Sequence, residues 1–375
     1  MRATMQHFKY KATVGSLLTC FAIVFAIPSL HADSENTFEA VAPVLIRHCL
    51  QCHQGSEPGG GLNLTTAEHF VAGGDSGKPT NNGTLKNSLL WDRVSNGEMP
   101  PESTLSEAEL ESIRAWIHAG APWQDRKLHL FDMTTEQRAG TDWWSLQPLK
   151  QSTIPADFRN EPNPIDAFVK ARLHSCELEL SPEADSATLF RRLSLHLHGM
   201  NPSQKAYIDL TDFDHHYNER VEIFLNSPRY GERWARHWLD LARFGESNGF
   251  ERDKARPDAW RYRDWVIEAF NNNMPYDEFC RMQIAGDCLP KAGTDGTIAT
   301  GFLVAGAYDD VGQSQQSAAM RAVVRQDELE DYVGTVSQAF LGLTTNCARC
   351  HDHKFDPILQ SEYYSLCAAL DGVKP

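Results

Sequence analysis

The sequence has no block of lysine or arginine residues, and negative charge exceeds positive charge along the chain. Its 375 residues include 35 basic and 50 acidic side chains, which gives a formal net charge of -15. Such a field repels nucleic acid and anionic lipid headgroups and favours encounter with a cationic partner. We therefore predict no nucleic-acid binding, and we expect a protein partner to present a basic surface.

The sequence also lacks segments in which apolar and polar residues alternate over the length of a strand, and it shows no internal repeat beyond two short cysteine motifs. Alternation marks half-buried strands, whereas helices bury residues three or four positions apart. The helical spacing of three or four residues is common in this sequence. Leu110, Ile113 and Ile117 form one apolar stripe, and Leu329 and Val333 begin another. We predict a mainly α protein.

A long apolar run stands at the N-terminus, from Val14 to Leu30, behind a basic start. It ends near the small residue Ala32, which is the pattern of a cleavable signal peptide over residues 1–32. The alternative is an uncleaved membrane anchor, although Pro28 lowers the quality of the run as a span. We predict an exported protein of the periplasm or cell envelope, associated with the membrane only if this segment is retained.

The length of the chain favours two domains, because single cores usually stop growing before this size. We predict a helical first domain over residues 34–124, a linker over residues 125–164 and a larger, mostly helical domain over residues 165–375. The first domain is expected to open with a helix capped at Asn36. It is expected to close with a helix whose capping box pairs Ser106 with Glu109.

Cysteine usage separates into two groups once Cys20, inside the apolar run, is set aside. Four cysteines belong to two Cys-x-x-Cys-His motifs. The other four are scattered, and in an oxidising compartment they form disulfides or remain buried thiols, with three possible pairings that the sequence does not distinguish. These four are Cys176, Cys280, Cys288 and Cys367.

The Cys-x-x-Cys-His spacing suits covalent attachment of haem. Two thiols can bond the two vinyl groups of the porphyrin, and the histidine after them can turn under the ring and ligate iron. Chance would produce one such run in a chain of this composition with a probability of roughly 0.01, so two coincidences are very improbable. We predict two haem c groups, one on Cys49, Cys52 and His53 and one on Cys347, Cys350 and His351.

These motifs have two other interpretations. A thioredoxin-like redox pair would open a helix within a βαβ unit, and no such unit is visible. Structural zinc is the stronger rival at the second motif, where His353 adds a fourth donor. Zinc usually takes its second pair of ligands from farther away in the sequence, and His353 lies too close to complete one tetrahedral site comfortably.

Met99 is the candidate for the sixth iron ligand at the first motif. It lies between the loops and the closing helix, followed by Pro100 and Pro101, which stiffen the chain that would present its sulfur. Thioether ligation raises the reduction potential, which suits electron transfer. For the second iron no distal ligand can be read from the sequence. His237, Met282 and Met320 are possible, and none is favoured.

Two stretches of the chain resemble known domains. The first, from Phe38 to Trp123, contains Cys49-Leu50-Gln51-Cys52-His53, Gly60-Gly61-Leu62, Gly97-Glu98-Met99-Pro100-Pro101 and Ile113-Arg114-Ala115-Trp116-Ile117. It resembles the planctomycete-type cytochrome C domain. The second contains Arg233-Trp234-Ala235-Arg236-His237-Trp238, Trp260-Arg261-Tyr262-Arg263-Asp264-Trp265-Val266 and the run from Phe340 to Pro357. It resembles the domain of unknown function that comes after that cytochrome domain.

The resemblance implies an exported haem-binding protein in which Cys49, Cys52, His53 and Met99 are haem-site positions and the second motif is haem-like. It also implies a further domain beyond Pro375. Our leading prediction is an electron-transfer protein that exchanges electrons with a redox partner protein. The alternatives are a haem-coupled enzyme acting on a substrate such as a carbohydrate, and a one-haem protein with zinc at the second motif. The enzyme hypothesis draws on an acidic cluster that we interpret mainly as a solvated face: Asp240, Glu246, Glu251, Asp253 and Asp258.

Overall fold

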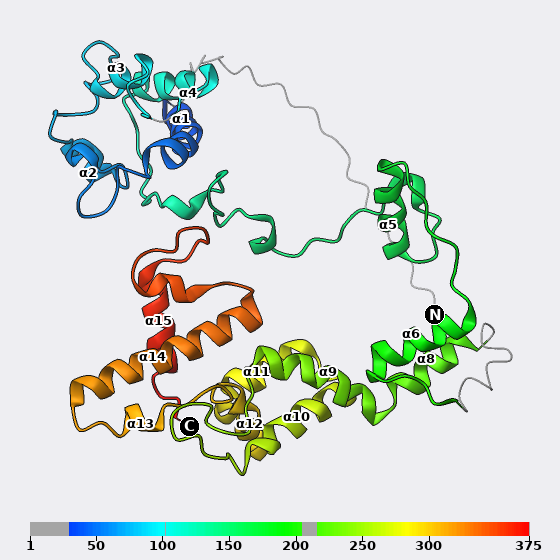
Figure 1. Cartoon of the computed structure of the whole chain (residues 1–375). Helices are drawn as coiled ribbons and strands as arrows, with labels where there is room; N and C mark the ends of the chain where they lie inside the picture. The colour runs from blue at the N-terminus through cyan, green and yellow to red at the C-terminus, as the bar shows by residue number, and fades with distance from the viewer. Residues whose placement is uncertain (1–29, 102, 205–215, 375) are drawn as a thin grey trace, which may run out of the picture. The chain divides into compact units, whose positions relative to one another are not determined.

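The computed structural model describes residues 30–101, 103–204 and 216–374, with side chains described from Thr37 onward. The chain divides into two compact units, Met1–Leu130 and Phe131–Pro375 (Figure 1). Among the described residues the regular structure consists of helices and short helical turns, without strands, which confirms the mainly α prediction. The N-terminal signal predicted for residues 1–32 lies outside the described residues, apart from the last three.

Four α-helices lie in the described part of the first unit. α1 (Leu30–Val44) begins earlier than the sequence predicts, so Asn36 lies inside the helix and does not cap it. A short π-helical turn, Leu45–Cys49, extends α1 to the first cysteine. α2 (Ala67–Ala72), α3 (Leu89–Ser95) and α4 (Glu107–His118) come after it. The predicted capping box of α4 is confirmed, because the side chains of Ser106 and Glu109 each accept a hydrogen bond from the other's backbone.

The core of the first unit forms where α1 packs against α4. Phe38 and Trp116 are fully buried, and the Trp116 ring lies 5.1 Å from that of Phe70. The ring of Trp123, just beyond α4, lies 5.1 Å from that of Phe38, and the Trp116 indole donates to the Pro122 carbonyl at 2.7 Å. Burial of aromatic side chains of this size is a large stabilising contribution, so α1 is firmly held up to the start of the cysteine motif.

The second unit contains the remaining helices. They are α5 (Pro164–Ser175), α6 (Ser186–His198), α8 (Tyr217–Leu225), α9 (Pro228–Leu241), α10 (Ala259–Asn271), α11 (Tyr276–Ala285), α12 (Gly293–Ala299), α13 (Asp310–Gln313), α14 (Ala318–Val336) and α15 (Gln360–Leu370). The division between the units falls at Leu130, within the predicted linker over residues 125–164. Apart from Pro164, where α5 begins, the regular structure of this stretch consists of short 3-10 turns.

Two buried clusters stabilise the second unit. The larger one joins α9, α10 and α11 with the segment after α12, and it includes Trp238, Trp265 and Phe302. The smaller one joins α14 to α15, and it includes Val333 and Tyr363. The stripe predicted along α14 is confirmed, because its first members are buried and Val336 and Phe340 pack against the larger cluster.

Two sets of apolar residues that recur at helical spacing are not fully buried. On α5, Ile165, Phe168 and Val169 are all exposed, since the main neighbour of this helix is the short 3-10 turn at Ala156–Phe158. On α9, which packs against α10, Trp238 is buried but Trp234 and Leu241 are exposed. No helix of the described part of the chain is long and apolar enough to cross a membrane.

Candidate functional site

The first Cys-x-x-Cys-His motif curls into a compact turn at the end of α1. The backbone N–H of Leu50 donates to the Leu45 carbonyl at 2.9 Å, closing the π-helical turn. The N–H groups of Cys52 and His53 then both donate to the Cys49 carbonyl, at 3.2 and 3.0 Å. These bonds bring both thiols and the imidazole to one cavity, which all three side chains line.

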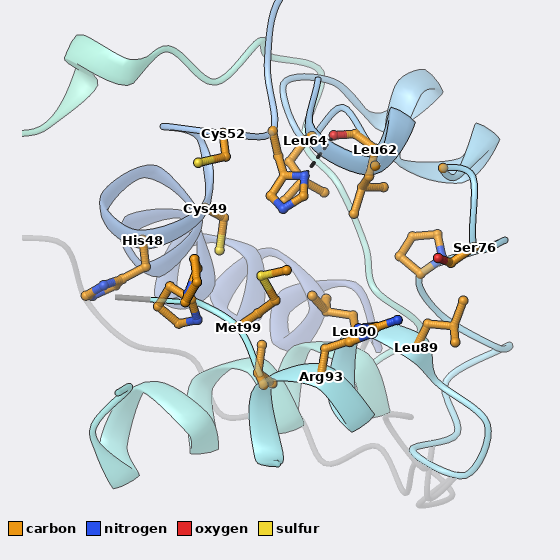
Figure 2. Close-up of a pocket in the computed structure, with 18 of the residues that line it drawn as sticks. His48, Cys49, Cys52, Leu62, Leu64, Ser76, Leu89, Leu90, Arg93 and Met99 are labelled. Atoms are coloured by element: carbon orange, nitrogen blue, oxygen red, sulfur yellow. Dashed lines mark hydrogen bonds between the residues drawn. The ribbon is translucent and has the colours of Figure 1, made fainter. Parts of the chain in front are cut away.

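This cavity has a volume of about 420 Å³ and a largely apolar wall (Figure 2). Leu62, Leu64, Leu89 and Leu90 contribute to the wall, and Figure 2 shows them around the same space as Cys49 and Met99. A cofactor pocket typically holds roughly 300–1,000 Å³ and combines apolar walls with a few polar groups. The polar side chains at this wall, besides the motif itself, are His48, Ser76 and Arg93.

Met99 reaches the cavity from the segment after α3. The N–H groups of Glu98 and Met99 both donate to the Arg93 carbonyl, at 2.9 and 3.1 Å, and the Gly97 N–H donates to Val94 at 3.2 Å. These bonds fold the chain back after the helix so that Met99 and the two prolines after it line the cavity. The Met99 side chain remains 36% exposed. The structure thus brings Met99 to the same cavity as Cys49, Cys52 and His53.

A backbone carbonyl orients the His53 ring. Nδ1 of His53 lies 3.1 Å from the Leu62 oxygen, and it donates the hydrogen bond because a carbonyl can only accept. This bond fixes the tautomer and leaves Nε2 with a free lone pair, as a metal-ligating histidine requires. The Leu64 N–H in turn donates to the His53 carbonyl at 2.9 Å, which ties the two segments together. The role of Leu62 could not be predicted from the sequence, because every residue has a backbone carbonyl.

Glycines allow the loop that carries Leu62 to pack closely. A Cβ at Gly74 would lie 2.5 Å from the Gly60 carbonyl oxygen and 2.9 Å from the Leu62 nitrogen, closer than atoms can approach. Gly60 and Gly61 have φ angles of 60° and 68°, in the left-handed region that glycine adopts without strain. The Gly-rich stretch therefore has a specific role, which is to carry the Leu62 carbonyl to the His53 ring.

The donor set in this cavity fits a covalently attached haem. Burial, and to a lesser degree the neighbouring Cys52, raise the pKa of the Cys49 thiol to about 12, so it is a neutral thiol in an apolar wall at neutral pH. Two thiols, an oriented imidazole and a thioether are the groups that c-type haem sites use. Arg93 also lines the cavity, and its Nη1 donates to the Glu98 carboxylate at 2.9 Å.

The second motif is built differently. Cys347 lies in a 3-10 helix, Thr345–Arg349, and Cys350 and His351 come directly after it. All three side chains are exposed, and none of them lines the haem-type cavity or the cavity of about 530 Å³ in the second unit. Nδ1 of His351 lies 2.7 Å from the carbonyl of its neighbour Asp352. The three residues thus lie on a surface turn. At the first motif Cys52 is also exposed, but Cys49 and His53 are partly buried and all three residues line one cavity.

His353 is a structural histidine. It is 4% exposed, and its Nδ1 accepts hydrogen bonds from the backbone N–H groups of Phe355 and Asp356, at 3.1 and 2.7 Å. Nε2 therefore carries the proton, and it lies 3.2 Å from the Thr344 hydroxyl. Both ring nitrogens are occupied in holding the loop after the motif. Within the described ranges, no group of three or more His, Cys, Asp or Glu side chains is gathered closely enough to hold a metal ion.

The remaining candidate residues lie apart from one another in the second unit. His237 is exposed on α9, Met282 is buried in the core on α11, and Met320 is exposed near the start of α14. The eight cysteines of the described residues are free thiols, and of the scattered four only Cys367 is fully buried. The exposure of Cys176 and Cys288 contradicts the buried-thiol interpretation for those two positions.

Two of the five carboxylates in the acidic cluster of the second unit pair with arginine. Asp258 pairs with Arg261 at 3.0 Å and Glu246 with Arg263 at 2.7 Å. The Asp253 carboxylate accepts hydrogen bonds from the Gly249 N–H and the Ser247 hydroxyl, which lower its pKa. This arrangement agrees with the interpretation of these residues as a solvated face with arginine partners.

Comparison with known proteins gives two family matches. Residues 49–103 match the family model described as Planctomycete cytochrome C, a match that supports a cytochrome c-like haem domain. Residues 164–374, more than half of the chain, match the model described as Protein of unknown function (DUF1549). No curated protein and no solved structure matches. The domain order agrees with the predicted resemblance, and the chain belongs to the DUF1549 family, here preceded by a planctomycete cytochrome C domain.

Proposed function

We propose that the chain is an exported c-type cytochrome that transfers electrons through a haem attached to Cys49 and Cys52. In this proposal His53 and Met99 would ligate the iron. The observation that carries it is the convergence of both thiols, the imidazole and the thioether on one apolar cavity. The match to a cytochrome C family over residues 49–103 supports the same assignment.

A bound haem supplies reversible one-electron chemistry, and the residues of the chain determine how it is held and tuned. The thiols fix the porphyrin edge, and the Leu62 carbonyl orients His53 so that Nε2 is the ligating atom. The leucine wall makes the surroundings of the site less polar, and together with a thioether ligand it would favour the reduced state and raise the reduction potential. The net charge of -15 favours a redox partner with a basic surface.

The proposal of a second haem at Cys347, Cys350 and His351 is supported by the Cys-x-x-Cys-His motif alone. Because these side chains are exposed, a porphyrin attached there would be covered less by the described residues than one at the first motif. Solvent exposure is one of the factors that set haem potentials, so the two sites would differ in potential. The proposed electron-transfer role depends on the first site and does not require the second.

The haem content can be tested on full-length protein matured with a c-type haem attachment system. We expect a pyridine haemochrome assay and intact mass to show haem on wild type, and loss of one haem from the Cys49→Ser/Cys52→Ser double variant. The Cys347→Ser/Cys350→Ser variant reports separately on the second motif. Wild-type protein without attached haem would refute the proposal.

The ligand assignment can be tested with Met99→Ala. This variant should keep its covalent haem but lose the visible-spectrum signature of methionine ligation, and its reduction potential should fall. Met200→Ala is the matched control, since Met200 is 43% exposed in the second unit and lies outside the cavity. An unchanged spectrum and potential in Met99→Ala would contradict the assignment of Met99.

A further inference from the structure

A second cavity, of about 530 Å³, lies in the second unit and has no role in the haem site. It is enclosed by the segment that leads into α10, by α12 and by the chain after α12. Its volume falls in the range of roughly 300–1,000 Å³ that is typical of small-molecule sites. All of its lining residues belong to the second unit.

One of the two arginines that line this cavity, Arg256, is held by neutral groups. Nε donates to the side-chain oxygen of Asn248 at 3.1 Å, and Nη1 donates to the carbonyls of Val304 and Ala305 at 3.2 and 3.1 Å. Among the described residues no carboxylate forms an ion pair or hydrogen bond with Arg256, and Asp253 interacts with it electrostatically only from a greater distance. Its hydrogen bonds within these residues use Nε and Nη1, which leaves Nη2 without a partner there. The guanidinium is therefore fixed in place with its charge uncompensated by direct contact.

The other charged groups at the cavity cancel each other. Asp258 and Arg261 both line it, and they pair with each other at 3.0 Å. Arg263, on the same helix, is paired with Glu246. Arg256 thus differs from the neighbouring arginines, and the cavity carries one excess positive charge within a chain of formal charge -15. A cation without a direct counterion at a cavity wall favours an anionic ligand.

The rest of the wall is mostly apolar. Phe244, Ile298 and Val304 contribute aliphatic and aromatic surface. Tyr262 also lines the cavity, but its hydroxyl donates inward to Gln283 at 2.7 Å, so the ring is what it offers to a ligand. Asn248 gives its side-chain oxygen to Arg256, which leaves its Nδ2 donor group without a partner in the described part of the chain. A ligand here meets a hydrophobic wall with two donors at one side.

We propose that this cavity binds a small organic carboxylate with an apolar or aromatic body. The carboxylate pairs with Arg256 Nη2 and accepts a second hydrogen bond from Asn248 Nδ2, and the body packs against Phe244 and Tyr262. The assignment is independent of haem binding, and it does not require the exposed acidic residues.

The test uses the full chain and two matched probes, 3-phenylpropionate and its neutral analogue 3-phenylpropanamide, with binding measured by calorimetry and ligand-observed NMR. A hydrogen bond to a charged group is stronger than a neutral one, so the acid should bind wild type about tenfold or more tighter than the amide. Arg256→Gln should abolish this preference. Arg263→Gln, which removes a paired arginine outside the cavity, should preserve it.

A second variant tests the cavity without changing Arg256, whose hydrogen bonds also hold the surrounding chain in place. Ala259 lines the cavity at the first position of α10, so Ala259→Phe should fill the space and weaken both probes without removing any hydrogen bond of Arg256. Equal affinity of acid and amide for wild type, or binding of neither at millimolar concentration, would overturn the proposal. Acid binding that survives Ala259→Phe unchanged would also overturn it, even if Arg256→Gln failed to fold.

Discussion

Replacing Gln283 with methionine should locally destabilise the core of the second unit by about 2–4 kcal/mol. Gln283, on α11, is fully buried, and its Oε1 accepts hydrogen bonds from the Trp238 indole and the Tyr262 hydroxyl, both at 2.7 Å. Methionine has a similar volume but cannot replace this acceptor. Trp238 keeps the Tyr262 oxygen at 3.1 Å, whereas the Tyr262 hydroxyl proton is left without a partner.

The magnitude comes from these bonds. An unsatisfied buried donor costs about 1–3 kcal/mol, and the loss of a neutral hydrogen bond adds about 1 kcal/mol. Hydrogen–deuterium exchange of the full chain measures the effect within one unit. A change of about 2–4 kcal/mol corresponds to roughly 30- to 1,000-fold faster exchange of peptides from α9, α10 and α11. Peptides from α1 and α4 serve as an internal reference and should not change.

Two comparisons make this prediction refutable. Gln338→Met replaces an exposed glutamine of the same unit and should change exchange by less than about threefold, as surface substitutions usually do. Tyr262→Phe should cost less in the Gln283→Met background than in wild type, because it removes the orphaned hydroxyl. Exchange rates in Gln283→Met that match those of Gln338→Met would show that the buried network contributes no net stability.

Two further predictions concern the first unit. Gly74→Ala should speed exchange of the loop around Leu62 by an amount equivalent to about 1–3 kcal/mol, since its Cβ would clash with backbone atoms. Gly59→Ala is the control, because its added Cβ would lie no closer than 3.4 Å to any neighbouring atom. If both variants speeded exchange of this loop equally, the clash at Gly74 would not be the cause. Partial burial raises the pKa of Glu109, but hydrogen bonds with Ser106 and His48 bring it below its ordinary value of 4.5. Its stabilisation of α4 is therefore present above pH 4.5 and lost as pH falls through the lower folded-state pKa. We expect the exchange rates of α4 in Glu109→Gln and in wild type, measured at matched pH, to become equal in acid. A difference between the two proteins that stays constant with pH would refute this expectation.

The sequence predicted those parts of the structure that depend on local chemistry. The capping box of α4 involves residues three positions apart, so its side chains reach each other in any helix that begins there. The buried stripe on α14 was likewise visible as spacing. For the candidate site, the motif and Met99 were predicted, and the structure places them around one cavity.

Other features depended on distant partners and could not be predicted. The exposed face of α5 has the spacing of a buried face, but burial requires a neighbour that the spacing does not specify. The two Cys-x-x-Cys-His motifs have the same cysteine and histidine spacing, yet the first lines a cavity and the second lies on the surface. The difference arises from the loop that comes after each motif. A Gly-rich loop folds over His53, whereas the loop after His351 closes on the His353 ring.

The two sides of the cavity at the first motif are anchored differently. Cys49 ends the π-helical turn that continues α1, and α1 is anchored by a packed aromatic core, so the histidine side is a rigid wall. Met99 stands on a connecting segment between α3 and α4 and is partly open to water. With the proposed ligands, an external small molecule such as imidazole would compete with the sulfur and not with the tethered ring. For the same reason, heating would break the bond from the Met99 sulfur before the bond from the His53 ring.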